Sequence, residues 1–368
     1  MNVPCESTLR FASALRKCGV PFEMHIYEKG GHGMATGDRV TNNCTLRAKN
    51  RIAESAAWIA DNRIGYIEEI KKQKGISAMI YETHKIELDY SKINAPKIDY
   101  TPTLTLMIPN LEKEFEGCDN YAARPTVLIL PGGGYAFRSD REAEPIAMHY
   151  LTHGFNCAVL YYSVAPAIFP VSLLETLTAI KFLRDNAQKY HVNKDKLYVC
   201  GFSAGGHLAA SAGTLWNGKE AKDYFGNTDD LKPSGTILAY PVISSDFDGC
   251  TRIHKGSFNN LLGPDRMNDT DMLEYLCLDR RVTRDTSPTF IWSTFEDTCV
   301  PCESTLRFAS ALRKCGVPFE MHIYEKGGHG MATGDKVTNN AVFRAKDWLA
   351  ESAAWIADNR IAYIDEIK

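Results

Sequence analysis

The chain lacks the features of a membrane protein or a nucleic-acid-binding protein. In its 368 residues, no apolar run approaches the roughly 20 residues that a membrane-spanning helix needs. Its 42 basic and 45 acidic residues are spread along the chain with a net charge of −3, so no basic stripe points to nucleic acid. With 44% hydrophobic and 24% charged residues, the composition is globular, and we expect neither a membrane nor a nucleic acid as partner.

The first residues of the sequence do not predict a secretion leader. Charged residues, among them Arg10 and Arg16, interrupt the N-terminal stretch that a leader would need as an apolar segment, so we expect a cytoplasmic protein. The 11 cysteines are scattered and odd in number, which does not favour a disulfide framework in a long chain without a leader. Cys299 and Cys302 form a CxxC pair, but the thioredoxin-like context that would indicate a redox role is absent.

Metal and nucleotide motifs are absent or incomplete. The sequence has no HExxH and no cluster of metal ligands, so we expect no metal. The glycine run that follows Pro131 does not complete GxGxxG, because Phe137 stands at the third glycine position. The segment GTLWNGKE ends in Glu220, where a phosphate-binding P-loop needs Ser or Thr. We therefore expect no cofactor.

A repeat dominates the organisation of the chain. Residues 3–71 and 300–368 are identical at 60 of 69 aligned positions. Two copies this far apart do not make a solenoid. A polar stretch, KQKGISA, follows the first copy, and a new pattern begins at Met79. We predict a complete domain over 79–368, preceded at 1–78 by a partial duplicate of its C-terminal helix–strand–helix segment and a linker.

Short apolar runs predict a mostly parallel sheet. Unbroken runs, typical of strands covered on both faces, lie at 126–130, 157–162, 197–200, 236–240 and 289–293. Segments 83–90 and 103–108 alternate apolar and polar residues, as half-exposed strands do. Helical patterns at 173–187 and 203–215 separate the strands, which predicts a doubly wound α/β sheet with helices on both faces. The long polar stretch 244–286 is irregular and predicts a lid or substrate-binding loop.

The strongest local signal is GFSAG at 201–205. It follows the strand-like LYVC and opens a helical pattern, which is the context of a nucleophile elbow. In such an elbow a sharp turn holds the serine in a strained conformation, and the flanking glycines leave room for the neighbouring strand and helix. The helix start directs backbone N–H groups at the site. We therefore predict that Ser203 is the nucleophile of an α/β-hydrolase fold.

The serine needs a base, and in this fold the acid and then the histidine follow it along the chain. His329 lies in GGHG, a glycine-rich loop directly after the strand-like FEMHIYE, where a catalytic imidazole is expected. His322 lies inside that strand and His207 one turn into the elbow helix, so both are interpreted as packing residues. His254 lies in the long insert, where nothing in the sequence supports a substrate contact.

The acid is predicted at Asp297, in preference to Glu296. It follows the strand-like TFIWST, and its role would be to accept the imidazole N–H, fix the tautomer and stabilise the imidazolium. The alternative is an acid in a surface turn. The order along the chain, the spacing and the position in a loop all favour the catalytic role.

An acyl-transfer site also needs donors for the oxyanion. PGGGY at 131–135 follows the strand-like TVLIL, in the place of the oxyanion loop of lipases and esterases. We predict the N–H groups of Gly133, Gly134 and Ala204 as the donors. Tyr135, Phe137 and Arg138 follow the two predicted glycine donors along the chain. We predict that they line the alcohol side of the site, although aromatic residues after a turn often simply pack.

At this point the motifs resemble those of a known family. PGGGY…SDREAEPIA, LYYSVAP…FP, GFSAGGHLAA, HKGSFNNLLG and SPTFIWSTFEDTCVP…VPFEMHIYEKGGHG are similar to the acetyl-esterase and xylan-esterase-like α/β hydrolases of gut and soil bacteria. The resemblance covers nearly all of 79–368. It implies a cytoplasmic carboxylic ester hydrolase that favours short acyl chains, often acetyl groups on plant-derived sugars. The family's triad would fall on Ser203, Asp297 and His329. The extension at 1–78 departs from the family's pattern.

The leading hypothesis is a serine esterase whose partner is a small-molecule ester such as an acetylated xylo-oligosaccharide. An amidase or peptidase with the same triad is one alternative, and a feruloyl esterase, decided by pocket width, is another. A non-catalytic assembly protein that uses the repeated segment is a third, and the complete set of triad residues argues against it.

The first copy of the repeat carries its own histidine, His32, in the same GGHG setting but begins too late to include an acid. The connection from Asp297 to His329 is short, which lowers the entropy of closing the loop. Trp348 is also replaced by Arg51 in the first copy. We therefore predict that His329 is the working base. Two placements of 1–78 stay open: on the surface of its own domain, or in the equivalent place of a second molecule, forming a domain-swapped homo-oligomer.

Overall fold

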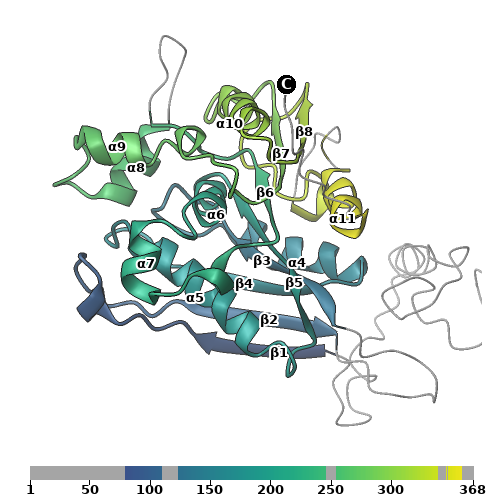
Figure 1. Cartoon of the computed structure of the whole chain (residues 1–368). Coiled ribbons are helices and arrows are strands. Elements are labelled where there is room, and N and C mark those ends of the chain that lie inside the picture. Colours follow the sequence, from purple (N-terminus) through teal and green to yellow (C-terminus); the bar gives the residue numbers. More distant parts are fainter. Residues whose placement is uncertain (1–78, 110–122, 246–253, 339–344, 346, 359–368) are drawn as a thin grey trace, which may run out of the picture. The chain divides into compact units, whose positions relative to one another are not determined.

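The computed structural model describes residues 79–109, 123–245, 254–338, 345 and 347–358 (Figure 1). Apart from Met79, these residues belong to the larger of the two units into which the chain divides, Ile80–Pro109 with Ala123–Lys368. The predicted duplicate at 1–78, and with it the question of its placement, lies outside the described residues. Among the described residues, no helix combines the length and apolarity needed to cross a bilayer.

Within the described residues, the strands form an eight-stranded sheet in the order β1-β2-β4-β3-β5-β6-β7-β8 (Figure 1). The strands are β1 (Met79–Lys85), β2 (Thr103–Pro109), β3 (Arg124–Leu130), β4 (Asn156–Tyr161), β5 (Val192–Phe202), β6 (Gly235–Ala239), β7 (Thr289–Thr294) and β8 (Phe319–Tyr324). β2 pairs with β4 antiparallel, whereas each neighbouring pair from β4 to β8 is parallel. The chain order changes direction between β3 and β5, and in open α/β sheets ligands bind beyond the strand ends at such a point.

Helices cover both faces of this sheet. The α-helices of the described residues are α4 (Glu144–Thr152), α5 (Val171–Asp185), α6 (Ala204–Thr214), α7 (Lys219–Phe225), α8 (Lys255–Leu262), α9 (Thr270–Tyr275), α10 (Glu303–Lys314) and α11 (Trp348–Asp358). Alternate side chains of a strand face opposite ways. Leu128 of β3 belongs to the core cluster that includes residues of α5 and α6. The preceding residue of β3, Val127, pairs with Cys157 of β4. The Sγ of Cys157 lies 3.4 Å from the carbonyl oxygen of Ala147 in α4, so α4 covers the opposite face of the sheet.

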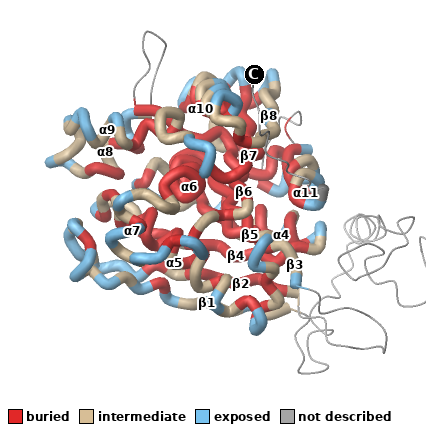
Figure 2. Tube along the Cα trace, in the orientation of Figure 1, coloured by how far each residue is buried: buried red, intermediate tan, exposed pale blue. Residues whose placement is uncertain are grey.

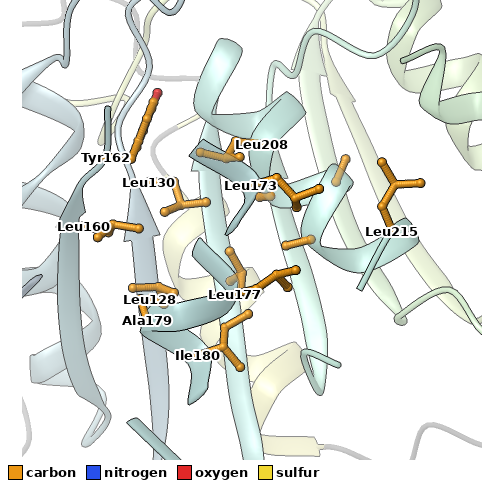
Figure 3. Close-up of a cluster of buried hydrophobic side chains, with 14 of the residues drawn as sticks. Leu128, Leu130, Leu160, Tyr162, Leu173, Leu177, Ala179, Ile180, Leu208 and Leu215 are labelled. Carbon is orange, nitrogen blue, oxygen red and sulfur yellow. The ribbon is translucent and has the colours of Figure 1, made fainter. Parts of the chain in front are cut away.

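The core explains why the apolar runs become central strands. The strands β4, β6 and β7 are almost entirely buried, as are β3 from Thr126 and β5 from Leu197 onward (Figure 2). Leu173, Leu177 and Ile180 recur at helical spacing along α5 and lie in the same buried cluster as Leu128 of β3 (Figure 3). Small residues and Leu208 allow α6 to lie close to the sheet. The predicted α/β-hydrolase architecture, a mostly parallel sheet between helices, is therefore confirmed.

Two local predictions differ from the structure. The first strand is β1 at Met79–Lys85, not 83–90. The strand cannot extend to residue 90, because Asp89 caps a 3-10 turn at Tyr90–Lys92 by accepting the N–H of Ser91. The stretch 244–286 is not irregular throughout. It holds α8 and α9, and Asp269 caps α9 by accepting hydrogen bonds from two N–H groups of its first turn.

Candidate active site

A sharp turn at Ser203 joins β5 to α6. Ser203 has φ 52° and ψ −115°, a left-handed conformation that costs energy for a residue with a side chain. A Cβ on Gly201 would lie 2.1 Å from the carbonyl oxygen of Gly205, and one on Gly205 would lie 2.2 Å from that of Leu130. Only glycine fits at either place, so the two glycines allow the turn that lifts the Ser203 hydroxyl above the sheet.

The structure brings Ser203, His329 and Asp297 together. The Nε2 atom of His329 lies 2.7 Å from the Oγ of Ser203, and its Nδ1 lies 2.7 Å from an Oδ of Asp297. The three residues follow β5, β8 and β7, and the carboxyl ends of these parallel strands meet at one edge of the sheet. Sequence reasoning could find them for this reason.

The carboxylate of Asp297 is held by the backbone. Its side chain is fully buried, and its second oxygen accepts hydrogen bonds from the N–H groups of Cys299 and Val300, both at 2.9 Å. Glu296 points elsewhere and accepts hydrogen bonds from Lys326 and from the N–H of Gly327. Asp297 is thus the carboxylate beside the imidazole, as predicted in preference to Glu296.

The glycine run after β3 forms a turn beside Ser203. Gly133 and Gly134 have φ +131° and +64°, and a Cβ on Gly133 would lie 2.2 Å from the carbonyl oxygen of Phe137. The Gly133 carbonyl accepts the N–H of Ala136 within the turn, which directs the N–H of Gly134 the opposite way, since the two groups of a trans peptide point apart. Within the described part of the chain, no acceptor takes the N–H of Gly133, Gly134 or Ala204. These predicted donors are thus available to an anion.

A cavity of about 400 Å³ opens above the nucleophile. Its lining comprises Ser203 and His329 together with Gly133, Gly134, Ala136, Phe137, Ser139, Arg141, Glu142, His254, Gly256, Asn260, Cys299 and Gly330. Asn260 of α8 donates its side-chain N–H to the carbonyl of Gly134 at 2.9 Å, so the insert supports the glycine turn. Sequence reasoning missed Asn260, Arg141 and Glu142. The motifs HKGSFNNLLG and SDREAEPIA, which carried the family resemblance, were the only signal for them.

Of the three residues predicted on the alcohol side, Phe137 lines this cavity, whereas Tyr135 and Arg138 do not. Tyr135 has φ +57°, which turns its side chain into the core, where it is 2% exposed and its hydroxyl lies 2.9 Å from Nδ1 of His207. Arg138 donates to the carbonyl of Tyr162 at 2.7 Å, with its guanidinium over the ring of Tyr100. Both side chains are engaged with the protein itself.

The other histidines lie where their sequence positions suggest. His207 is buried, with Nε2 lying 3.1 Å from the carbonyl oxygen of Leu276, and burial lowers its pKa to about 4. His322 faces Glu320 and Glu351. His254 lines the cavity, although nothing in the sequence supported a substrate contact for this residue. In the part of the chain that the structure describes, no three His, Cys, Asp or Glu side chains are grouped as metal ligands.

Comparisons with known proteins agree with this geometry. The BD-FAE family model matches residues 118–312, which include the glycine turn, Ser203 and Asp297. The chain is 36% identical over 231 residues to endo-1,4-β-xylanase B of Butyrivibrio fibrisolvens. The aligned region covers 61% of this chain and 35% of that relative. The chain is 28% identical over 212 residues to the acetylxylan esterase of Xylanibacter ruminicola, 56% of this chain and 41% of the relative. The chain therefore spans less than half the length of these two curated relatives.

A solved structure covers more of the chain. The acetyl ester-xyloside bifunctional hydrolase from Caldicellulosiruptor lactoaceticus is similar with a TM-score of 0.63 and 30% sequence identity. The match covers 75% of this chain and 96% of that one.

Proposed function

Since the chain belongs to the BD-FAE family of α/β hydrolases, we propose that it is a serine esterase that hydrolyses acetyl and other short-chain esters of carbohydrates. At the coarser level, its described domain is a carboxylic ester hydrolase similar to acetylxylan esterases. The observation that carries the proposal is the continuous chain of 2.7 Å contacts from Asp297 through His329 to Ser203 beside a turn with free N–H groups.

In the proposed mechanism, Asp297 accepts the Nδ1–H of His329, so that Nε2 is left to take the proton of Ser203. The Ser203 oxygen attacks the ester carbonyl, and the N–H groups of Gly133, Gly134 and Ala204 stabilise the negative charge that develops. His329 returns its proton to the departing alcohol. A water molecule, deprotonated by His329, then releases the acid from the acyl-enzyme.

The polar lining of the cavity supports an alcohol rich in hydroxyl groups. Ser139, Arg141 and His254 contribute hydrogen-bonding groups to it. Burial, and to a lesser degree the nearby His329, lowers the pKa of His254, which favours the neutral imidazole. Its Nδ1 lies 2.8 Å from the hydroxyl of Ser257, and among the described residues its Nε2 has no partner. A sugar hydroxyl could therefore bind Nε2.

Two measurements test this proposal. The protein should hydrolyse acetylated xylo-oligosaccharides and p-nitrophenyl acetate, and faster than longer acyl esters, a feruloyl ester or an acetanilide. A fluorophosphonate probe should label the unaltered protein but not Ser203→Ala. Failure of both labelling and hydrolysis would refute the esterase assignment, whereas a preference for the feruloyl ester or the anilide would favour the alternative hydrolases.

A further variant tests which histidine acts as the base. His329→Ala should lose nearly all activity. Activity comparable to that of the unaltered protein would mean that His32 of the first copy, which lies outside the described residues, takes the place of His329.

A further inference from the structure

A buried carboxylate that the mechanism does not use lies in the cavity lining. Glu142, in the 3-10 turn Asp140–Glu142, is 3% exposed. Its Oε2 accepts the N–H of Gly132 at 2.8 Å, and its Oε1 accepts the hydroxyl of Tyr240 at 2.7 Å. Burying a carboxylate is costly unless its hydrogen bonds compensate, so these two contacts call for an explanation.

The contact to Gly132 fixes the glycine turn against the nucleophile. A Cβ on Gly132 would lie 2.7 Å from the carbonyl oxygen of Phe202 and 3.1 Å from the Cβ of Ser203. The backbone at Gly132 is therefore packed directly on the elbow, one residue before the predicted oxyanion donors. Because Glu142 holds the N–H of Gly132, it sets the position from which the N–H groups of Gly133 and Gly134 face the serine.

The contact to Tyr240 reaches the histidine loop. Tyr240 directly follows β6 with φ +36°, and its hydroxyl oxygen also accepts the N–H of Ala332 at 2.8 Å. Ala332 is three residues after His329 and has φ +50°. The Tyr240 ring packs edge-on to the His329 imidazole, with 5.1 Å between the ring centroids. One carboxylate thus connects the turn that holds the anion to the loop that holds the base.

The position of Glu142 needs a side chain with two acceptor oxygens, which a carboxyl group provides. Gly132 N–H can only donate, and the Tyr240 hydroxyl must donate to Glu142 while its oxygen accepts from Ala332. A glutamine would direct its NH₂ group at one of these donors. Burial raises the pKa of Glu142, opposed by the hydrogen bonds from Tyr240 and Gly132 and by the nearby His329 and Arg141.

We propose that Glu142 is a positioning residue that keeps the oxyanion turn and the histidine loop in fixed register around Ser203. This inference rests on the proposed esterase function. Its effect should appear in the chemical step, because both carboxylate oxygens are taken up by the N–H of Gly132 and the hydroxyl of Tyr240. We expect Glu142→Gln to lower kcat for p-nitrophenyl acetate by roughly 10- to 100-fold, less than the full loss of an oxyanion donor. KM should change by less than about threefold.

Two further variants make the test specific. Tyr240→Phe keeps the carboxylate but breaks the connection to Ala332, so it should also lower kcat, and the double variant should be no slower than Glu142→Gln alone, because both changes break one network. Glu175→Gln is the matched control. Glu175 is also buried, but its two partners are the N–H and the hydroxyl of Ser163, and a hydroxyl can turn to accept from a glutamine. This control should keep its kcat.

Melting temperatures distinguish a positioning role from a loss of folding. If Glu142→Gln does not fold, Tyr240→Phe decides. The inference is overturned if the folded variants keep kcat within about twofold of the unaltered enzyme, or if the effects of the two changes multiply in the double variant. Failure of the proposed function would look different, because the unaltered protein would then hydrolyse no ester and take up no fluorophosphonate, which would end both proposals.

Discussion

The clearest quantitative prediction concerns the pH dependence of stability at Glu175. This residue of α5 is 1% exposed, beside a second cavity of about 300 Å³ that contains no triad residue. Its oxygens accept the hydroxyl of Ser163 at 2.5 Å and the N–H of Ser163 at 2.7 Å. Burial outweighs these two hydrogen bonds and raises the pKa of Glu175 from 4.5 to about 7.

The sign follows from proton binding in the two states. Between pH 4.5 and about 7 the folded protein holds a proton on Glu175 that the unfolded chain has released, so the free energy of unfolding falls as pH rises. Above pH 7 both states are ionised and the penalty is constant. One pKa unit corresponds to about 1.4 kcal/mol, so ionisation at Glu175 removes about 2.5 kcal/mol between pH 5 and pH 8.

Glu175→Gln removes the ionisation at this position and with it the loss of stability, and it keeps a hydrogen bond to both the N–H and the hydroxyl of Ser163. The assay is urea unfolding of both proteins at pH 5 and pH 8. Other titrating groups contribute equally to the two proteins, so the stability of the variant relative to the unaltered protein should rise by about 2.5 kcal/mol from pH 5 to pH 8. A relative stability that is the same at both pH values, or one that falls, would refute the reasoning that burial dominates at this carboxylate.

Four other substitutions have defined outcomes. Asp297→Asn should leave the fold intact but lower kcat by about 10³- to 10⁴-fold, because an amide N–H beside Nδ1 favours the wrong tautomer of the imidazole; a pH-independent loss under tenfold would contradict this role. Trp348→Arg should lower the free energy of unfolding by about 3–5 kcal/mol in urea titrations, since the fully buried indole also donates to the carbonyl of Ala332. Gly328→Ala should keep kcat/KM, because its Cβ would meet open space, whereas Gly327→Ala, at φ +129° and within 3.0 Å of Met331, should lose most of it.

Much of the fold could be predicted because local pattern and tertiary environment agree. The apolar run at 126–130 becomes the inner part of β3, and that at 289–293 becomes β7. The positions of Asp297 and His329 followed from the same logic, since each comes directly after a parallel strand. Such segments can be predicted from the sequence because the secondary structure that each one favours locally is the one that the fold requires there.

The missed features depend on backbone turns and on burial that composition does not reveal. Tyr135 points into the core because Gly134 and Tyr135 both adopt positive φ, and nothing in PGGGY distinguishes that from an exposed turn. Glu142 stands in the charged stretch SDREAEP, which by pattern is a solvated surface. Its burial depends on Gly132 and Tyr240, and these donors are brought to it only by the folded sheet.

The same contacts bear on why the segment 300–368 should supply the base. The backbone of Ala332, just after His329, is held at both of its polar groups: its N–H donates to Tyr240 and its carbonyl accepts the indole N–H of Trp348. The Trp348 ring packs against Trp292 and Phe202, the residue before the nucleophile. At the equivalent position the first copy carries Arg51, which could reach that carbonyl only by bringing a charge into a fully buried place. The two segments carry the same GGHG, but only one has the residue that holds the following backbone against the elbow, so we expect the stability of the site to select His329.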